Sequence, residues 1–560
     1  AVYRWIERLD AEPALPGRPD VGREPLWAAL DRRADDTEIA ITEMVGEGPG
    51  ESVTFAELAA DVRRVAAGLV DLGVAPGDRV AILVPPGIDL AVCIYACWRM
   101  GAVVVIADAG LGVRGMGRAL KGADPRYLIG IPKALAVARA ARWPGIRVSS
   151  AEMSGIRSRL LKVAETLAGL RRRGRDASAP SEPGPLDDAA ILFTSGSTGP
   201  AKGVAYSHHQ LQAQRDAIVD LYGLTSADRL VAAFGPFALF GPGIGITSVV
   251  PDMEVTSPGT LTAQALADAV AAVDATLVFG SPAALKNVSA TASDLSTRQH
   301  LALQGVRLVM SAGAPVPSAI LSDITAIMPN AESHTPYGMT EVLPVADISF
   351  TEIRRAGEGF GVCVGQTVPG VDAAISPLDS AGEATGGLTT EPGAVGEVCV
   401  KADHIRDGYD GLWLTEAAAT MPGGWHRTGD VGHLDHEGRL WIEGRLAHLI
   451  RTALGPVTPI GIEHAVAELP TVALAAAIGV GPPGSQQVVV VAVPVDGVKR
   501  PELAGEEFAA RIRATIAVDV AAVFAVPSLP VDKRHNSKID RTRVAAWAEP
   551  ILAGGRVGRL

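Results

Sequence analysis

Short apolar runs alternate along this chain with stretches in which apolar residues recur every three or four positions. The stretch 54–73 has the helical spacing and begins with a capping-box pattern of threonine and glutamate. Apolar runs over 80–84 and 101–107 predict buried strands, with a helix over 90–100 between them. Because a strand, a helix and a strand in this order build a parallel unit, the pattern predicts an α/β fold.

The alternation continues and divides the chain into two parts. Before about residue 443 it predicts a helix over 210–221, a hairpin with its turn near 436–438, and strands over 127–131, 230–234, 276–279, 306–310 and 396–400. After it, helices are expected over 462–469 and 508–518, and strands over 472–480 and 488–495. We therefore predict a large layered α/β N-terminal domain over 1–443 and a smaller α+β C-terminal domain over 444–560.

A basic amphipathic stretch, 157–175, ends in a cluster of arginines and is followed by a Ser/Pro-rich linker over 177–185. Such a stretch is most often a solvated helix, which is the favoured interpretation. The alternative is a docking face for an acidic partner or a membrane surface, so peripheral membrane contact stays open.

Composition narrows the class of protein. The chain has 560 residues, 48% of them apolar, and a net charge of −12. These values predict a globular protein and argue against disorder and against binding to nucleic acid. The long charge-free runs 230–251 and 469–495 are interrupted by prolines and glycines, so no transmembrane segment is expected. Four cysteines and an N-terminus without the apolar core of a signal peptide are compatible with the cytoplasm.

The strongest candidate for chemistry follows a buried strand predicted over 189–193. Six residues with only hydroxyl or hydrogen side chains come next, and a lysine follows after two more positions. Glycines let backbone N–H groups approach a polyanion, hydroxyls add donors and a lysine adds a point charge. Composition alone favours a flexible Gly/Ser loop. The preceding strand and the following lysine instead favour a triphosphate cradle built by Thr194, Ser195, Gly196, Ser197, Thr198, Gly199 and Lys202.

The run 191–203 resembles the phosphate loop of the adenylate-forming superfamily, which includes acyl-CoA synthetases, luciferases and adenylation domains. Four further motifs occur in the superfamily's order: 337–341, 427–430, 444–445 and 530–541. The resemblance implies ATP and Mg²⁺ as cofactors, catalytic roles for Lys538, Glu341 and Thr340, and metal ligation by Glu341 and Thr194. It also implies an ATP/AMP site that includes Gly313, Ala314, Pro315, Tyr337, Gly338, Met339, Asp430 and Arg445.

The residues of these motifs suit those roles physically. The ring of Tyr337 can stack on adenine, and Glu341 can hold Mg²⁺. Asp430 can accept both ribose hydroxyls, and the resemblance adds Arg445 beside it, at the hinge to the small domain. The resemblance brings Lys538 to the α-phosphate and the carboxylate, where negative charge develops during adenylation. Taken singly, each motif is more often a turn, a cap or a solvated loop.

Several positions depart from the acyl-CoA ligase pattern. Ala447 stands where CoA-binding members usually carry aspartate or lysine, and the glycine-centred stretch that lines their pantetheine tunnel is replaced over 450–463. The segment 234–240 lacks their gating histidine. The variant segments 129–133, 236–240, 341–344 and 534–538 instead resemble the olefin-biosynthesis β-lactone synthetases (OleC type).

This second resemblance implies adenylation of a long-chain β-hydroxy fatty acid, followed by attack of its own β-hydroxyl to give a β-lactone, AMP and pyrophosphate. Other enzymes of hydrocarbon or β-lactone biosynthesis are implied as partners. Candidates for the acyl pocket are Phe234, Phe237, Leu239, Phe240 and His208. His208 and His535 are candidates for a base by residue type alone, and each is more often structural or superficial.

Three alternatives stay open: a fatty-acyl-CoA ligase, an acyl-AMP ligase, and a non-catalytic nucleotide-binding partner. The first two share every adenylation residue. The presence of both Lys538 and Glu341 argues against the third.

Overall fold

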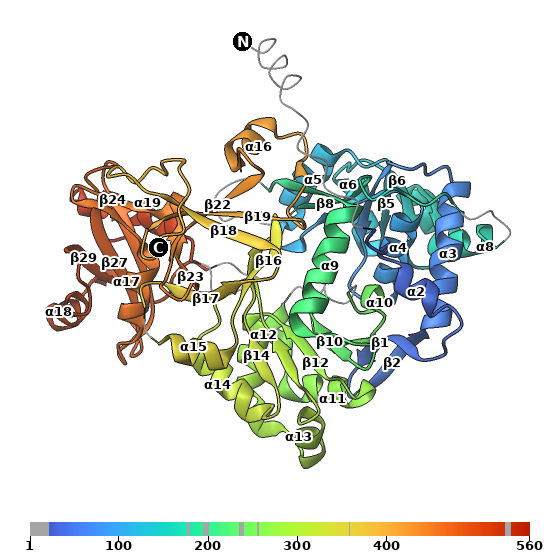
Figure 1. Ribbon diagram of the computed structural model, residues 1–560, viewed down its shortest axis with the longest axis horizontal. Coiled ribbons are helices and arrows are strands. Elements are labelled where there is room, and N and C mark those ends of the chain that lie inside the picture. The colour runs from blue at the N-terminus through green and yellow to red at the C-terminus, as the bar shows by residue number, and fades with distance from the viewer. Residues whose placement is uncertain are drawn as a thin grey trace, which may run out of the picture.

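The computed structural model describes residues 22–175, 180–193, 201–234, 240–254, 257–357, 359–531 and 539–560. They form a mixed α/β structure with a large N-terminal domain and a smaller C-terminal one (Figure 1). Two mostly parallel sheets and one antiparallel sheet make up the N-terminal part. The α/β prediction with a smaller second domain is confirmed.

The first sheet has the strand order β20-β9-β8-β4-β3-β5-β6-β7. Its strands are β3 (Arg79–Leu83), β4 (Val103–Ala107), β5 (Tyr127–Gly130), β6 (Ile146–Ser149), β7 (Val163–Thr166), β8 (Asp188–Phe193), β9 (Gly203–Ser207) and β20 (Gly408–Tyr409). The helices between them are α3 (Phe55–Asp71), α4 (Ile88–Arg99), α5 (Gly112–Ala123), α6 (Pro132–Ala140), α7 (Gly155–Leu161) and α8 (Leu167–Arg173). The predicted capping box of α3 is present, with Thr54 as N-cap.

The second sheet has the order β14-β13-β12-β10-β11-β1-β2. Its strands are β1 (Ile39–Val45), β2 (Gly48–Thr54), β10 (Arg229–Ala233), β11 (Thr247–Val250), β12 (Leu277–Gly280), β13 (Leu308–Met310) and β14 (Glu332–His334). Its helices are α2 (Ala28–Arg32), α10 (Phe240–Ile244), α11 (Ala263–Val273), α12 (Pro282–Ala290), α13 (Thr297–Leu303) and α14 (Ser318–Ile327). Helix α9 (His208–Tyr222) packs Leu211 against the core of the first sheet and Ile218 in that of the second, so it joins the two layers (Figure 1).

The third sheet is antiparallel, with the order β15-β16-β17-β23-β22-β19-β18 and β21 beside β22. Its strands are β15 (Tyr337–Met339), β16 (Val342–Asp347), β17 (Val362–Thr367), β18 (Val371–Pro377), β19 (Gly396–Ala402), β21 (Thr420–Met421), β22 (Trp425–Leu434) and β23 (Leu440–Arg445). Helices α15 (Phe350–Ala356) and α16 (Trp413–Ala419) flank it. The β22–β23 pair confirms the predicted hairpin around 436–438.

The C-terminal part is the predicted α+β unit. A sheet of order β26-β27-β29-β28 contains β26 (Val472–Val480), β27 (Gln487–Pro494), β28 (Glu502–Leu503) and β29 (Val520–Ala525). Helices α17 (Pro459–Ala467), α18 (Glu506–Ala514) and α19 (Arg541–Leu552) pack on it, and β24 (Ile450–Thr452) and β25 (Gly455–Val457) form a hairpin. The boundary expected between 443 and 444 falls within β23 and stays a prediction.

The basic stretch 157–175 is not one helix, so that expectation was wrong. Lys162 adopts a left-handed φ of +53° and ends α7. Residues 163–166 then pair in parallel with β6 as the strand β7, and the Thr166 side chain caps α8. The order is therefore helix, strand, helix, because pairing at the sheet edge overrides the helical spacing of the sequence.

No helix in the described ranges combines the length and the apolar character that crossing a bilayer requires.

Candidate active site

Three of the predicted nucleotide-site residues form one hydrogen-bonded unit in the third sheet. The Tyr337 hydroxyl donates to Asp430 Oδ2 at 2.5 Å, and Arg445 Nε lies 2.7 Å from Asp430 Oδ1. Asp430 is buried, while the Arg445 side chain is 44% exposed and so reaches the surface. An ionised carboxylate offers about four acceptor positions, so Asp430 keeps capacity for further hydroxyl donors.

Local sequence explains why Asp430 is held in place. Its N–H donates to Thr428 Oγ1 at 3.0 Å, and the Thr428 hydroxyl donates to the Val398 carbonyl at 2.8 Å. Gly429 between them has a φ of +71°, a conformation that favours glycine. The Thr-Gly-Asp sequence is therefore a bend within β22 that aims the carboxylate toward Tyr337.

The negative charge of Asp430 shifts the pKa values of both of its partners. The charge of Asp430 raises the pKa of Arg445. Burial, together with the neighbouring Asp430 charge, holds the pKa of Tyr337 well above its usual range. Tyr337 therefore remains a neutral donor and Arg445 a fixed cation at every physiological pH.

A second cluster forms around Tyr409 and brings the residues predicted for the phosphates and the metal together. The Tyr409 hydroxyl donates to Glu341 Oε1 at 2.7 Å. Lys202 Nζ lies 5.2 Å from the centroid of the Tyr409 ring, and the Arg406 guanidinium carbon lies 4.2 Å from it. The Thr340 carbonyl accepts a hydrogen bond from Tyr206. Lysine, carboxylate and tyrosine thus lie in one neighbourhood.

Strand β20 is what places Tyr409 there. It pairs antiparallel with β9, so that Tyr409 faces Val204, two residues after Lys202. Arg79 forms a bidentate ion pair with Asp410, at 2.7 and 3.1 Å, which ties this short strand to the first sheet. Sequence reasoning missed Tyr409, Arg406 and Tyr206, since nothing in the local pattern signals a pairing across 200 residues.

Glu341 fits one part of a magnesium site. Mg²⁺ in ATP-using enzymes is usually held by one or two carboxylates, with phosphate oxygens and water completing its octahedron. Within the described ranges no group of three or more His, Cys, Asp or Glu side chains could hold a metal ion unaided. A site that Glu341 shares with ATP fits these residues, and Thr194, its predicted second ligand, lies outside the described residues.

The predicted loop Gly313, Ala314 and Pro315 follows β13 at the carboxyl end of the second sheet. Gly313 has a φ of +100° and is exposed. Just before it, the Ser311 N–H donates to the His334 carbonyl at 3.0 Å. The loop therefore lies beyond the strand ends, where open parallel sheets bind ligands. Gly338 is needed nearby, since a Cβ there would lie 2.8 Å from the Val342 carbonyl oxygen.

A small apolar cavity of about 20 Å³ lies beside this loop. It is lined by side chains of α9, of the ends of β12 and β13, and of the segment around β16: Ile218, Tyr222, Phe279, Met310, Ala312, Pro336, Leu343 and Pro344. Phe234 packs on Phe279 with ring centroids 5.7 Å apart, and Phe240 joins the same apolar cluster. Two of the predicted pocket residues thus pack in the apolar cluster that contributes to the lining of this cavity, and the cavity itself is too small for a long acyl chain.

His208 lies elsewhere. It begins α9, is 1% exposed and meets the Trp27 ring edge-on at 5.8 Å. Ile218 and Tyr222 are ten and fourteen residues further along the helix, roughly 15–21 Å away at about 1.5 Å per residue. Burial lowers the pKa of His208 to about 4. The structure therefore does not bring His208 to the apolar cavity, and its position suits packing between layers better than proton transfer.

The junction with the C-terminal part contains a buried glutamate. Glu443 accepts from Thr458 Oγ1 at 2.9 Å and lies 2.6 Å from His433 Nδ1. Gly444 follows with a φ of +155°, and a Cβ there would approach the Pro459 ring at 3.1 Å. Ala447, the predicted departure from CoA-binding enzymes, is an exposed residue of a short 3-10 turn.

The remaining predicted residues lie outside the described ranges: Thr194, Ser195, Gly196, Ser197, Thr198, Gly199, Phe237, Leu239, His535 and Lys538. The described residues on either side of 194–200 and of 532–538 are paired with each other. Phe193 and Gly203 are paired across β8 and β9, and Val531 and Ile539 form an antiparallel bridge. Ile539, the residue that follows Lys538 in the sequence, is thus held in the C-terminal part.

The chain is similar to several known proteins in sequence and in fold. The sequence model of the AMP-binding enzyme family matches residues 27–410. The olefin beta-lactone synthetase of Xanthomonas campestris pv. campestris is 36% identical over 89% of this chain and 91% of its own length. That of Stenotrophomonas maltophilia is 34% identical over 92% of this chain and 96% of its own length. The amide bond synthetase McbA of Marinactinospora thermotolerans superposes with a TM-score of 0.75 at 27% identity, over 94% of this chain and all of McbA.

Proposed function

Since the chain belongs to the AMP-binding enzyme family, we propose that it adenylates a long-chain β-hydroxy fatty acid and closes the acyl-adenylate to a β-lactone. That it is an AMP-forming ligase of the adenylate-forming kind follows from the family and from its relatives. The identity of the acid and the closure of the ring are the proposed steps.

One observation carries the proposal. Two relatives named olefin beta-lactone synthetase match this chain at 36% and 34% identity over about nine-tenths of its length. Supporting it, the residue at position 447 is alanine in this chain, and the segment 234–240 contains no histidine. Both features differ from the pattern of enzymes that pass the acyl group to CoA.

The first step is transfer of AMP to the acid. A carboxylate oxygen attacks the α-phosphorus, the bond to the β-phosphate oxygen breaks and pyrophosphate leaves. In the proposed arrangement Asp430 and Arg445 hold the ribose, Tyr337 stacks on the base, and Lys202 with the loop 194–199 binds the phosphates. Lys538 neutralises charge between the carboxylate and phosphorus. Mg²⁺, held by Glu341 and Thr194 when bound, would neutralise charge on the departing phosphates.

The second step needs no further substrate. The β-hydroxyl oxygen attacks the acyl carbonyl, the carbon–oxygen bond to AMP breaks and the hydroxyl proton is released. A nucleophile tethered two carbons from the carbonyl has an effective concentration far above that of any dissolved acceptor. This advantage, and the good leaving group, offset the strain of the four-membered ring. The apolar side chains beside Gly313, Phe279 and Met310 among them, are the proposed surroundings of the acid's alkyl part.

We propose the cytoplasm as the site of the reaction. The four cysteines are free and buried, which suits a reducing compartment.

Product analysis tests the proposal. The protein is incubated with ATP, Mg²⁺ and a long-chain β-hydroxy acid, with and without CoA, and the products are resolved by mass and by infrared absorption. We expect AMP and a product with the mass of the acid minus water and the carbonyl stretch of a β-lactone. The same acid without its hydroxyl is the control, and it should be adenylated without lactone. An acyl-CoA as main product would assign the ordinary ligase activity instead.

A further inference from the structure

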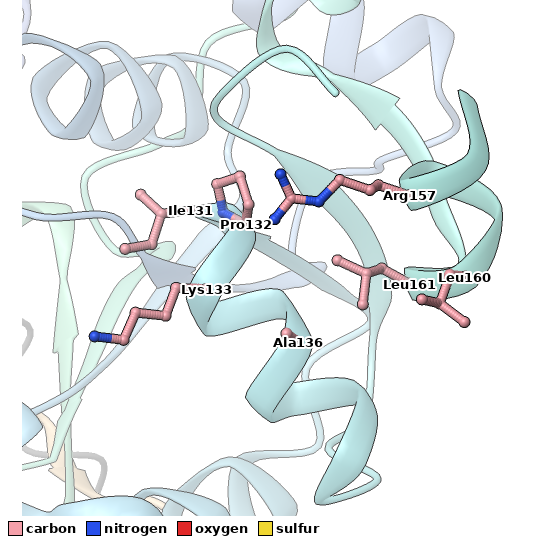
Figure 2. A pocket seen from close by; sticks show the side chains of 7 residues that line it. All are labelled: Ile131, Pro132, Lys133, Ala136, Arg157, Leu160 and Leu161. Atoms are coloured by element: carbon pink, nitrogen blue, oxygen red, sulfur yellow. The ribbon is translucent and has the colours of Figure 1, made fainter. Parts of the chain in front are cut away.

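A surface cleft of about 560 Å³ lies between α6 and α7, outside the residues assigned to ATP (Figure 2). Pro132, Lys133 and Ala136 of α6 line one side, and Arg157, Leu160 and Leu161 of α7 line the other. Figure 2 shows the Arg157 side chain reaching from α7 toward Pro132. The lining of the cleft therefore combines apolar side chains with two cationic residues, Lys133 and Arg157.

Helix α7 presents its large aliphatic side chains to water. Ile156 is 81% exposed and Leu160 is 72% exposed, and no residue of the helix is buried. Positions four apart lie on the same side of a helix, so the two side chains form one apolar ridge. A helix at the surface normally turns this ridge toward the core. In α7 only the neighbouring Leu161 does so, by packing on the core of the first sheet.

The charge around this ridge is opposite to that of the whole protein. The chain has a net charge of −12, yet residues 133–162 contain seven cations and a single acidic residue. That acidic residue, Glu152, lies 3.8 Å from Arg172 and so is itself paired with a cation. The cations are Lys133, Arg139, Arg142, Arg147, Arg157, Arg159 and Lys162.

The cations nearest the ridge are available to an outside partner. Lys133, Arg157, Arg159 and Lys162 are exposed, and no carboxylate of the described residues lies within ion-pairing distance of them. Elsewhere on the same sheet arginines are paired, as Arg173 is with Glu165 at 2.7 Å. The cations of α6 and α7 are thus not used to hold the fold together.

We propose that the surface formed by α6 and α7 docks the protein on an anionic lipid membrane. Ile156 and Leu160 would enter the interfacial region, while the surrounding cations lie at the level of the phosphate headgroups. An exposed aliphatic pair flanked by lysine and arginine is the composition of helices that lie on anionic bilayers. An acidic protein could form ion pairs with the cations. The protruding apolar ridge, however, must be buried either in a soft apolar medium or in a matching groove, and a lipid membrane supplies such a medium.

Membrane docking goes beyond the proposed function and does not depend on it. Vesicle binding is measured without turnover, so a negative result for binding would not contradict the proposed reaction, and the reverse also holds. Docking through this surface would bring the enzyme to the phase in which long-chain acids dissolve.

Flotation of the full chain with vesicles tests the proposal. We expect binding to phosphatidylcholine vesicles that contain roughly 30% phosphatidylglycerol, and little binding to phosphatidylcholine alone. Binding should fall as salt rises to about 0.5 M, because screening weakens the headgroup contacts. An acidic acyl carrier protein in place of vesicles forms the second arm.

Two double variants separate the apolar and the charged contributions. Ile156→Asp with Leu160→Asp, and Arg157→Glu with Arg159→Glu, should each lower the partition coefficient on anionic vesicles about tenfold or more. Leu454→Asp is the matched apolar control, since Leu454 is 96% exposed in the C-terminal part. Lys499→Glu with Arg500→Glu, also exposed, is the charge control. All these positions are superficial, and equal thermal unfolding midpoints would verify intact folding.

Each outcome of the flotation experiment either supports or overturns membrane docking. Loss of binding in the two α7 variants with retention in both controls supports the proposal. Absence of wild-type binding at low salt, or equal binding by the α7 variants, overturns it. Binding to the carrier protein without binding to vesicles overturns it too, and assigns the surface to an acidic protein.

Discussion

The hydroxyl of Tyr337 donates a 2.5 Å hydrogen bond to Asp430, a residue 93 positions later in the chain. The residue predicted to stack on adenine and the one predicted to hold the ribose are therefore mechanically one unit. Arg445, at 2.7 Å on the other carboxylate oxygen, extends this unit to the junction with the C-terminal part. Any change to one member is expected to displace the others.

Tyr337→Phe should raise the KM for ATP several-fold, because Asp430 loses a donor that fixes its orientation. Asp430→Asn should raise it about tenfold or more, since a hydrogen bond to a charged group contributes about 1.5–3 kcal/mol. ATP–pyrophosphate exchange measures both. The free-energy change calculated from the KM of the double variant should be smaller than the sum of the two single changes, with a coupling of about 1 kcal/mol. Strict additivity would show that the two residues act independently.

Tyr409→Phe should raise the Mg²⁺ concentration needed for half-maximal adenylation by about threefold or more. The hydroxyl holds Glu341 Oε1 at 2.7 Å, and a carboxylate that loses this contact is less well placed for the metal. Tyr95→Phe is the matched control, because it removes a buried tyrosine hydroxyl in α4, away from Glu341. Equal shifts in both variants would contradict a specific link between Tyr409 and the metal.

Much of the fold follows from local sequence. The capping box of Thr54, the apolar runs that become β3, β4, β5 and β8, and the 436–438 hairpin are patterns within a few residues, and the structure has them. For the stretch 157–175 the same reasoning gave a wrong prediction. Its helical spacing was outweighed by the pairing of β7 with β6 at the sheet edge, a contact that no local pattern encodes.

The site was predictable where a motif is contiguous and not where tertiary pairing assembles it. Residues 337–341 and 427–430 were found because each resembles a contiguous superfamily motif, whereas Tyr409 depends on β20 reaching β9 across about two hundred residues. His208 was a candidate by residue type alone. The length of α9 instead separates it from the cavity near Tyr222.

His334 should make stability depend on pH. Burial lowers its pKa, but the 2.6 Å contact with Asp347 and nearby negative charge outweigh burial, and the net effect is a raised pKa. The charged ring therefore stabilises the folded state fully below the unfolded pKa of about 6.5. This contribution is lost as pH rises through the folded pKa.

The variant His334→Gln should accordingly lose more stability at pH 6 than at pH 9. Urea unfolding midpoints at the two pH values measure the difference, with the exposed His300→Gln as control. An identical loss at both pH values would mean that the ring acts by packing alone.

Lys538→Ala should lower the rate of pyrophosphate release by roughly 10²-fold or more while ATP still binds, because a charge aimed at the developing transition state is removed. Lys533→Ala, five residues earlier in the same segment, is the control and should retain activity. Wild-type rates in the Lys538 variant would remove that lysine from the catalytic set.

The segment that ends in Lys538 is followed in the sequence by residues that are anchored in the C-terminal part. Arg541 begins α19 and forms an ion pair with the buried Glu463 of α17, its Nε donating to Oε1 at 2.7 Å. The same oxygen also accepts from the Ala477 N–H at 2.9 Å, so the pair is anchored to β26. Val531 and Ile539 close the base of the segment by an antiparallel bridge. Because Lys538 directly precedes Ile539 in the sequence, a change in this anchorage is expected to alter its catalytic contribution.

Arg541→Ala should therefore slow adenylation about tenfold or more with little change in the KM for ATP, because most of the residues proposed to hold ATP belong to the N-terminal sheets. Removing one partner of a buried pair also leaves Glu463 uncompensated, so the unfolding midpoint of the C-terminal part should fall. Glu463→Gln in the same background would restore stability without restoring the rate, which separates positioning from folding. Arg543→Ala, an exposed change two residues away, is the control and should affect neither. A rate that recovers with stability would show that Arg541 only supports the fold.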